Sequence, residues 1–368
     1  MFNNVYKNKK VLITGHTGFK GSWLTTWLLK LGAHIIGISK DIPTTPSMFE
    51  VLNLESKITH YQNDIRNLDQ ITNIISFEKP DFLFHLAAQP IVSLSFTNPI
   101  ETISSNVIGT SHILEALRIS NHKCTAIIIT SDKAYDNVEQ VWGYKENDTL
   151  GGKDIYSGSK GAAELIIKSY YNSFFKHKTS NIKLAIGRAG NVIGGGDWAQ
   201  DRIIVDSVKA WSQNKIVELR NPYSTRPWQH VLEPLSGYLS LGHNLYMEDT
   251  LNGEAFNFGP NANENKTVQE LILDLSKFWD LNHQNCIYKI TDKDISFTEA
   301  KLLKLNCDKA QFYLHWKETL NYKDTIKFVG EWYYSFYQLE NQDFYKQTYE
   351  QIIEYENLAT IKGLKWTE

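Results

Sequence analysis

The feature that most constrains the fold is a glycine-rich segment near the N-terminus, between a short apolar run and an amphipathic stretch. Gly15, Gly18 and Gly21 form the pattern G-x-x-G-x-x-G, directly after a predicted strand at 11–14 and directly before a predicted helix at 23–31. Glycine lets the backbone turn tightly and approach a pyrophosphate, while a helix N-terminus offers unpaired N–H groups and a positive dipole end. In this context the pattern predicts dinucleotide binding, although a purely structural turn would use the same glycines.

The first half of the chain repeats this alternation of apolar runs and amphipathic stretches. Predicted strands at 34–39, 82–85, 126–130 and 184–187 alternate with predicted helices at 68–77, 106–120 and 157–174. The runs are too continuous for burial on one side, so they predict a parallel sheet covered by helices on both faces. The expected class is α/β, with a Rossmann-type doubly wound parallel sheet. Ligands bind at the carboxyl ends of such strands, so the polar residues that follow each strand are the candidates for a site.

A second, smaller lobe of mixed α/β structure is expected because the alternation fades after about residue 190. A predicted helix at 231–245 and a predicted strand at 255–258 return to the first lobe. We therefore expect a dinucleotide-binding domain from 1–187 plus about 228–258. Residues from about 188–227 plus 259–368 would form the substrate-binding domain.

Charge and cysteine content exclude several classes of protein. The 38 Lys and Arg nearly balance 41 Asp and Glu, and there is no long basic run, so no nucleic-acid partner is expected. No stretch approaches the ~18 apolar residues of a membrane span, and the lysines at 7–10 precede too short an apolar run for a signal peptide. Cys124, Cys286 and Cys307 lack disulfide or metal-site spacing, which favours a cytoplasmic protein without a metal.

Two carboxylates are candidates for the adenosine end of the dinucleotide. Asp41 follows the second strand, where a carboxylate binds ribose hydroxyls and favours NAD, whereas Lys40 beside it leaves NADP open. Asp64 and Ile65 follow a third strand-like stretch and suit the adenine edge. Asp64 could equally cap a helix that begins near residue 68.

A second group of polar residues predicts chemistry at the same sheet edge. Tyr156 and Lys160 are four residues apart and share one helix face, where the ammonium and a positive nicotinamide nearby would favour the phenolate and let Tyr156 accept a hydroxyl proton. Ser131, Asp132 and Lys133 directly follow the predicted strand at 126–130. A solvated loop with a capping Asp is the alternative. Together with the glycines, these residues predict one catalytic crevice.

Six segments carry a family resemblance. They are GHTGFKG at 15–21, HLAAQ at 85–89, TSDK at 130–133, YSGSK at 156–160, RAGNVIGGGDW at 188–198 and RPWQH at 226–230. Together they resemble the CDP-glucose 4,6-dehydratases, NAD-dependent enzymes of the extended short-chain dehydrogenase type that act on nucleotide sugars. The resemblance covers about residues 5–335, and the last two segments are its most specific part.

The resemblance implies a three-stage reaction on CDP-glucose that yields CDP-4-dehydro-6-deoxyglucose and water, for deoxysugar and surface polysaccharide synthesis. Tyr156 would deprotonate the 4-hydroxyl as hydride passes to NAD, with Ser131 and Lys160 orienting the sugar. Asp132 would be the acid at the C6 hydroxyl and Lys133 the base at C5, before hydride returns to C6. The resemblance further implies a homodimer or higher homo-oligomer.

The resemblance also implies two sets of binding residues. The cofactor-binding set is Gly15, Thr17, Gly18, Phe19, Lys20, Gly21, Asp41, Asp64, Ile65, Leu86, Ala87, Ala88, Tyr156 and Lys160. The substrate-binding set is Gln89, Ser95, Asn191, Arg202, Arg220 and Arg226, in which arginines suit a diphosphate because their forks donate two hydrogen bonds. Trp198 and Trp228 are interpreted as core residues.

The chain departs from the family at two positions and from the related dTDP-glucose dehydratases at a third. Ser93 stands where an arginine is expected, Ala134 replaces a usual cysteine, and Lys133 stands where dTDP-glucose dehydratases have Glu. The alternatives are a dehydratase of another nucleotide hexose, a nucleotide-sugar 4-epimerase and a non-catalytic NAD-binding sensor. An epimerase needs no acid and base for C5 and C6, so Asp132 and Lys133 disfavour it.

Overall fold

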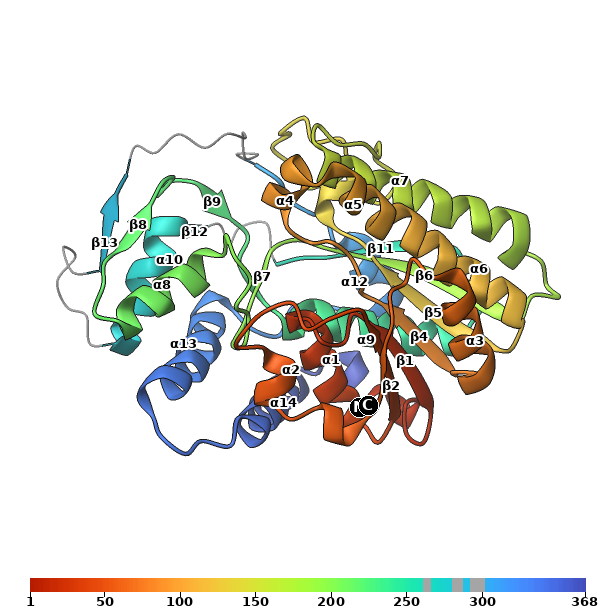
Figure 1. Cartoon of the computed structure of the whole chain (residues 1–368), viewed down its shortest axis with the longest axis horizontal. Helices are drawn as coiled ribbons and strands as arrows, with labels where there is room; N and C mark the ends of the chain where they lie inside the picture. Colours follow the sequence, from red (N-terminus) through yellow and green to blue (C-terminus); the bar gives the residue numbers. More distant parts are fainter. Residues whose placement is uncertain (261–265, 280–286, 292–301) are drawn as a thin grey trace.

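A computed structural model describes residues 1–260, 266–279, 287–291 and 302–368 (Figure 1). Its main sheet has seven strands in the order β11-β6-β5-β4-β1-β2-β3, and all its neighbours pair in parallel. The strands are β1 (Lys10–Thr14), β2 (His34–Ser39), β3 (Thr59–Gln62), β4 (Phe82–His85), β5 (Cys124–Ile129), β6 (Ile182–Ala189) and β11 (Ala255–Phe258). The predicted doubly wound parallel sheet is confirmed.

Helices cover both faces of this sheet, because alternate strand residues point to opposite sides. Val11 and Ile13 of β1 belong to the core cluster beneath α1 (Phe19–Lys30), α9 (Leu232–Met247) and α14 (Phe344–Ile361). Leu12, between them, belongs to the cluster beneath α3 (Leu68–Glu78), α6 (Thr110–Ser120) and α7 (Ile155–Tyr170). The strand order reverses direction between β1 and β4, which is where a ligand crevice forms in such sheets.

The second lobe lies to one side of the sheet (Figure 1). Its elements are β7 (Val192–Ile193), α8 (Ile203–Ser212), β8 (Val217–Leu219), β9 (Thr225–Arg226), β10 (Gln229–His230), β12 (Lys266–Thr267), α10 (Val268–Ser276), β13 (Tyr288–Ile290) and α13 (Tyr322–Gln338). Three two-stranded ribbons join β10 to β7, β12 to β9 and β13 to β8. Cys286, one of the three cysteines, lies outside the described residues.

Shorter helices complete the described chain. They are α2 (Met48–Val51), α4 (Val92–Thr97), α5 (Pro99–Ile103), α12 (Asp308–Leu314), the π-helical turns Ser104–Gly109 and Tyr171–Phe175, and the 3₁₀ turns Phe2–Asn4, Glu55–Lys57, Asp132–Ala134, Lys277–Trp279 and Lys365–Thr367. Within the described ranges, no helix has the length and apolar character that crossing a membrane requires.

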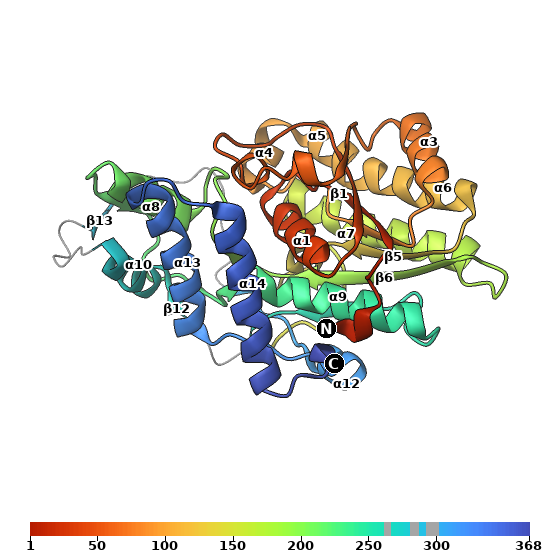
Figure 2. The same cartoon turned by 90° about the horizontal axis from the view of Figure 1, so that it is seen from below.

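The C-terminal helix α14 packs against the first helix of the chain. Glu356 of α14 accepts a hydrogen bond from Trp27 Nε1 at 2.8 Å and pairs with Lys30 Nζ at 2.6 Å, both on α1. Figure 2 shows α14 between α13 and the first lobe. Residues far apart in sequence therefore share one core.

Candidate active site

The glycine-rich loop packs tightly against the end of β4. Gly15 has φ +76°, and a Cβ built there would lie 2.8 Å from the backbone nitrogen of Ala87. A Cβ on Gly21 would lie 2.2 Å from the carbonyl oxygen of Gly15. Larger residues at either position would therefore push the loop out of place. The backbone is thus held close to the sheet edge, as dinucleotide binding requires.

The N-terminus of α1 is open to an anion. Gly18 is its N-cap, no side chain in the described part of the chain caps it, and its first turn holds no acidic residue. The leading N–H groups of a helix have no partner within the helix and attract negative charge. Thr17 is tied by its hydroxyl to the backbone oxygen of Asp41 at 2.8 Å, and Phe19 begins the helix. This loop fits the pyrophosphate of a dinucleotide.

The end of β2 carries the carboxylate that the sequence assigned to the ribose. Asp41 is exposed and lies 3.7 Å from Lys40 Nζ, which also pairs with Glu101 at 3.3 Å. The Lys40 ammonium is therefore shared by two carboxylates. A 2′-phosphate would have to compete with both.

Asp64 pairs with Arg66 and does not cap a helix. Arg66 donates to both carboxylate oxygens, which lowers the pKa of Asp64. Asn67 is the N-cap of α3, because its side chain accepts the backbone N–H of Gln70. The capping alternative for Asp64 is therefore wrong. Ile65 is buried and belongs to a core cluster.

The segment after β4 is fixed by backbone contacts. The N–H groups of Leu86 and Ala87 donate to the backbone oxygen and to Oγ1 of Thr14, at 3.1 and 3.2 Å. Ala88 is half-buried beside them. These residues therefore sit at the carboxyl ends of β1 and β4, next to the glycine loop.

Two residues assigned to the substrate lie outside the pocket. Gln89 uses its side chain internally, since Nε2 donates to Thr102 Oγ1 at 2.8 Å and Oε1 accepts the Ile91 N–H at 2.6 Å. Ser95 is completely buried, and its hydroxyl donates to Val92 O at 2.7 Å. Both side chains therefore stabilise α4 or the residues that lead into it, and neither lines the cavity.

The structure brings the catalytic candidates together at the end of β5. Ser131 caps the 3₁₀ turn that follows, where its Oγ accepts the Lys133 N–H at 3.2 Å and donates to Asp132 Oδ1 at 2.9 Å. Tyr156 and Lys160 face this turn from α7, and each is only 7% exposed. Lys160 Nζ lies 6.0 Å from the centre of the Tyr156 ring.

Burial dominates the ionisation of the Tyr156–Lys160 pair. It raises the pKa of Tyr156 to about 12, although Arg202 and a hydrogen bond to Ser131 oppose the shift. It also lowers the pKa of Lys160 to about 8, against the effect of Glu164. The predicted preference for the phenolate rests on the positive nicotinamide together with Lys160, and the chain alone does not test it. Burial, which penalises the charged form, outweighs the neighbouring cation.

Asp132 is suited to hold a proton. It is 7% exposed, and burial raises its pKa despite Lys133, Ser131 and Lys20 nearby. Lys20 projects from the second residue of α1, and burial together with Lys160 lowers its pKa to about 8. The glycine loop thus contributes a side chain to the electrostatics of the catalytic turn.

A buried ion pair lies next to the catalytic turn and is hydrogen-bonded to Thr130, the residue that precedes the turn. Glu164 of α7 and Arg188 of β6 are 1% and 3% exposed and pair directly. Glu164 Oε1 also accepts from Thr130 Oγ1 at 2.6 Å, and Arg188 Nη1 donates to the Tyr135 hydroxyl at 2.6 Å. Sequence reasoning missed this network. The one signal available was Arg188, a charged residue directly after the predicted strand 184–187, which the structure extends to Ala189.

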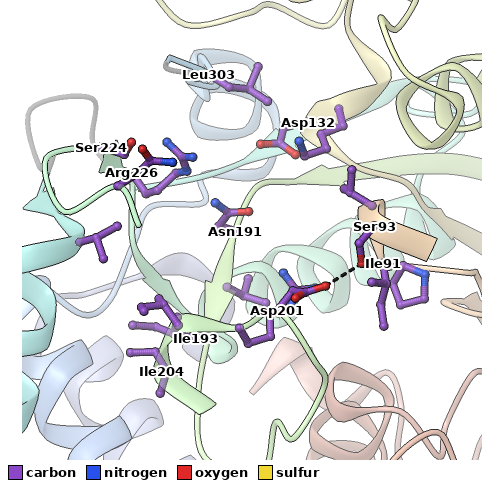
Figure 3. Close-up of a pocket in the computed structure, with 18 of the residues that line it drawn as sticks. Ile91, Ser93, Asp132, Asn191, Ile193, Asp201, Ile204, Ser224, Arg226 and Leu303 are labelled. Carbon is purple, nitrogen blue, oxygen red and sulfur yellow. Dashed lines mark hydrogen bonds between the residues drawn. The ribbon is translucent and has the colours of Figure 1, made fainter. Parts of the chain in front are cut away.

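A cavity of about 720 Å³ opens beside this turn (Figure 3). Six of the assigned residues line it, namely Asp132, Lys133, Asn191, Arg202, Arg220 and Arg226. Asp197 and Asp201, which were not assigned, line it as well, and Ser93 Oγ donates to Asp201 Oδ2 at 2.6 Å. Trp198 is 3% exposed and packs in the core as expected, whereas Trp228 is buried but also borders the cavity.

Comparisons with known sequences define the family. The chain matches the GDP-mannose 4,6 dehydratase family over residues 12–329. It is 44% identical over 333 residues to a CDP-glucose 4,6-dehydratase of Salmonella typhimurium, covering 90% of this chain and 92% of the relative. It is 26% identical over 353 residues to a CDP-paratose 2-epimerase of Salmonella typhi, covering 88% and 98%.

Solved structures share the fold at low identity. A UDP-glucose 4-epimerase from Thermotoga maritima superposes with a TM-score of 0.76 at 20% identity, covering 89% of this chain and 99% of the other. A dTDP-glucose 4,6-dehydratase from Bacillus anthracis in complex with NAD gives 0.72 at 20% identity, covering 92% and 99%. With the family match spanning most of the sequence, the chain belongs to the GDP-mannose 4,6-dehydratase family.

Proposed function

We propose that this enzyme converts CDP-glucose to CDP-4-dehydro-6-deoxyglucose and water, with NAD as its cofactor. The observation that carries the proposal is the position of Asp132 and Lys133, which line the cavity, with Asp132 close enough to Tyr156 to raise its pKa. An acid and a base beyond the Tyr/Lys pair are what elimination of water across C5 and C6 requires. The relative of 44% identity carries the same activity in its name.

NAD would be held by the glycine loop and by the segment after β4. The pyrophosphate suits the open N-terminus of α1 at Gly18, and the ribose suits Asp41. When bound, NAD supplies a hydride acceptor for C4 of the hexose and a donor for C6. Titration of the purified protein with NAD and NADP tests the assignment, since tighter binding of NADP would show that Lys40 binds a 2′-phosphate.

Tyr156 accepts the proton of the 4-hydroxyl in the first stage. Burial raises its pKa to about 12, so the phenol is protonated in the chain alone, and positive charge nearby, including that of the nicotinamide, would favour the phenolate. Lys160, Arg202 and the Ser131 hydroxyl are the groups on this chain that assist. Ser131 is held for this by the turn it caps.

Asp132 and Lys133 act in the second stage. A ketone at C4 acidifies the C5–H bond, Lys133 takes that proton, and Asp132 donates a proton to the departing C6 oxygen. Burial of Asp132 favours its neutral form, which is the form an acid catalyst needs.

The two lobes divide recognition between them. We infer that residues 1–187 plus about 228–258 bind the dinucleotide, while 188–227 plus 259–368 bind the nucleotide sugar. Arg202, Arg220 and Arg226 of the second lobe line the cavity with Asn191, and arginine forks fit the two phosphates. Packing of α14 on α1 ties the end of the second segment to the first lobe.

A 4-epimerase is the competing function on this fold. Incubation with CDP-, dTDP-, UDP- and GDP-hexoses, followed by alkali, distinguishes the two because a 4-keto sugar develops ultraviolet absorbance and an epimer does not. We expect a 4-keto product with CDP-glucose. Interconversion of two nucleotide hexoses without that absorbance would refute the dehydratase assignment.

We also propose a cytoplasmic homodimer that covers apolar side chains on α5 and α7. Ile100 and Leu165 are 75% and 56% exposed, on helices that pack against each other. Exposed apolar surface of this kind marks protein–protein contacts. Light scattering after gel filtration tests this, and a wild-type monomer at micromolar concentration would contradict it.

A further inference from the structure

One turnover of the proposed dehydratase leaves two side chains of the active site in changed protonation states. Tyr156 accepts the proton of the 4-hydroxyl, and Asp132 gives a proton to the oxygen that leaves C6. Lys133 takes the C5 proton and returns one to C5 as hydride arrives at C6, so its protonation state at the end is the one it started with. Tyr156 has therefore gained a proton and Asp132 has lost one. The next turnover requires a phenolate and a carboxylic acid again.

Ser131 is hydrogen-bonded to both of these groups. Its Oγ donates to Asp132 Oδ1 at 2.9 Å, and its side chain also forms a hydrogen bond with Tyr156. A serine hydroxyl has one hydrogen to give and two lone pairs that accept. The hydrogen goes to Asp132, one lone pair accepts the Lys133 N–H at 3.2 Å, and the second lone pair can accept the Tyr156 hydroxyl. The hydrogen bonds can therefore run in one direction, from Tyr156 through Ser131 to Asp132.

The backbone fixes the Ser131 hydroxyl between α7 and the catalytic turn. Ser131 is the N-cap of the 3₁₀ turn, with extended backbone at φ −149° and ψ 157°. The residue before it, Thr130, donates to buried Glu164 of α7 at 2.6 Å. Both contacts restrict movement of the segment that carries Ser131. A proton relay requires such a fixed hydroxyl, because each transfer needs hydrogen-bond contact.

Direct transfer avoids a state with two negative charges. Tyr156 and Asp132 are each only 7% exposed. Burial raises the pKa of Tyr156, and the charge of Asp132 adds to the increase. Loss of the Tyr156 proton to solvent, while Asp132 is a carboxylate, would therefore put two anions into one buried site. Transfer to Asp132 moves one negative charge without adding another. Positive charge near the phenol, from Lys160 and from oxidised nicotinamide, favours this direction.

We propose that Ser131 relays a proton from Tyr156 to Asp132 after each turnover and so restores both groups without exchange with solvent. The Tyr156 O–H bond breaks as an O–H bond forms on Ser131 Oγ. The original Ser131 O–H bond breaks, and its hydrogen binds Asp132 Oδ1. A phenolate and a carboxylic acid result, and no proton enters or leaves the site. Rotation about the last side-chain bond of Asp132, a broad torsion, presents the acid to the cavity that Asp132 lines.

The relay rests on the proposed dehydratase function. A 4-epimerase would not need it, because its tyrosine returns the proton to the same sugar in the second half of the reaction. Only the loss of the C6 oxygen as water takes a proton from one group after another group has received one.

The dependence of turnover on buffer concentration tests the relay. At constant pH and ionic strength, imidazole should not accelerate the wild type, because its protons move internally. In Ser131→Ala, the two groups can be restored only through solvent. We expect its steady-state rate to lie about 10²-fold below that of the wild type, which is the lower end of what one positioned proton transfer contributes. This rate should rise with imidazole concentration.

The first turnover separates the relay from orientation of the sugar by Ser131. Enzyme equilibrated with NAD starts with both groups restored. Rapid quenching of Ser131→Ala should therefore show that the first 4-keto product in each site forms faster than the later ones. Imidazole should accelerate only the later turnovers. Loss of orientation alone would slow the first and later turnovers equally, and neither would respond to imidazole.

Two variants serve as matched controls. Ser131→Thr keeps the hydroxyl, so its turnover should remain independent of imidazole. Ser159 is 3% exposed on α7, and its Oγ donates to the backbone oxygen of Tyr156 at 2.7 Å. Ser159→Ala therefore removes a buried serine hydroxyl near Tyr156 but outside the relay, and its turnover should also be independent of imidazole.

The outcomes distinguish the relay from the function on which it rests. A wild type that imidazole accelerates would overturn the relay, and so would a Ser131→Ala variant whose steady-state rate, however low, does not respond to imidazole. In both cases the dehydratase function would stand. Failure of the wild type to form any 4-keto product would instead refute the proposed function, and the relay with it.

Discussion

Removal of the Glu164 charge should destabilise the first lobe more than any surface charge change. The pair with Arg188 is almost fully buried, and Glu164 also accepts hydrogen bonds from Arg188 Nε at 2.8 Å and Thr130 Oγ1 at 2.6 Å. Breaking a buried ion pair on one side typically costs about 3–5 kcal/mol, because the other charge stays buried without a partner. We therefore expect Glu164→Leu to lower the free energy of unfolding by about that amount.

Urea unfolding followed by tryptophan fluorescence measures this loss. The double variant Glu164→Leu with Arg188→Met should recover most of it, since apolar replacement of both partners is often neutral. Glu354→Gln is the matched control, because its pair with Lys327 is about half exposed and such pairs contribute ~0–1 kcal/mol. A loss below about 1 kcal/mol in Glu164→Leu, or a double variant no more stable than the single one, would refute the reasoning.

Three further predictions concern the site and the core. Tyr156→Phe should prevent oxidation at C4 yet bind NAD nearly as the wild type does, and wild-type formation of reduced nicotinamide after mixing with substrate would rule out its role. Lys133→Met and Asp132→Asn should still oxidise C4 but form 4-keto-6-deoxy product about 10²–10⁴-fold more slowly, and turnover of Lys133→Met within a fewfold of wild type would place the C5 base elsewhere. Glu233 is buried, and its pKa is raised to about 7 from 4.5, so its contribution to stability is fully present below pH 4.5 and is lost as the pH rises through about 7. Glu233→Gln should flatten that decline in unfolding free energy between pH 5 and 7.5, and an unchanged slope would contradict the assignment.

Most of the sheet could be predicted from the sequence because its strands other than β3 are largely continuous apolar runs between residues that break strands. β2, β4 and β11 begin and end at the predicted residues. α1 begins four residues before its prediction, because Gly21 lowers helix propensity locally. The structure nevertheless needs glycine there, since a Cβ would meet Gly15 O. The contact between the glycine loop and α1 therefore sets where this helix begins, whereas the helix propensity of Gly21 predicted a later start.

The site was only partly predictable for a related reason. Motifs located the catalytic turn, because Ser131, Asp132 and Lys133 directly follow a strand, whereas the family resemblance located the arginines of the cavity. Gln89 and Ser95 were assigned by resemblance alone, and hydrogen bonds within their own segment occupy both side chains. The pair of Glu164 and Arg188 joins a helix to a strand 24 residues away, and nothing in local sequence shows that they meet.

The contact between α14 and α1 has a consequence for synthesis of the protein. α1 leaves the ribosome among the first segments, yet Trp27 and Lys30 find their partner Glu356 only after some 330 further residues have been added. Chains are made at about 5–20 residues per second, so the helix that carries the glycine loop waits tens of seconds with one side open. Ribosomes arrested before α14 should therefore display Trp27 to solvent, and a chain stopped there should bind chaperones. The first long helix to be synthesised is therefore among the last to acquire all of its packing contacts.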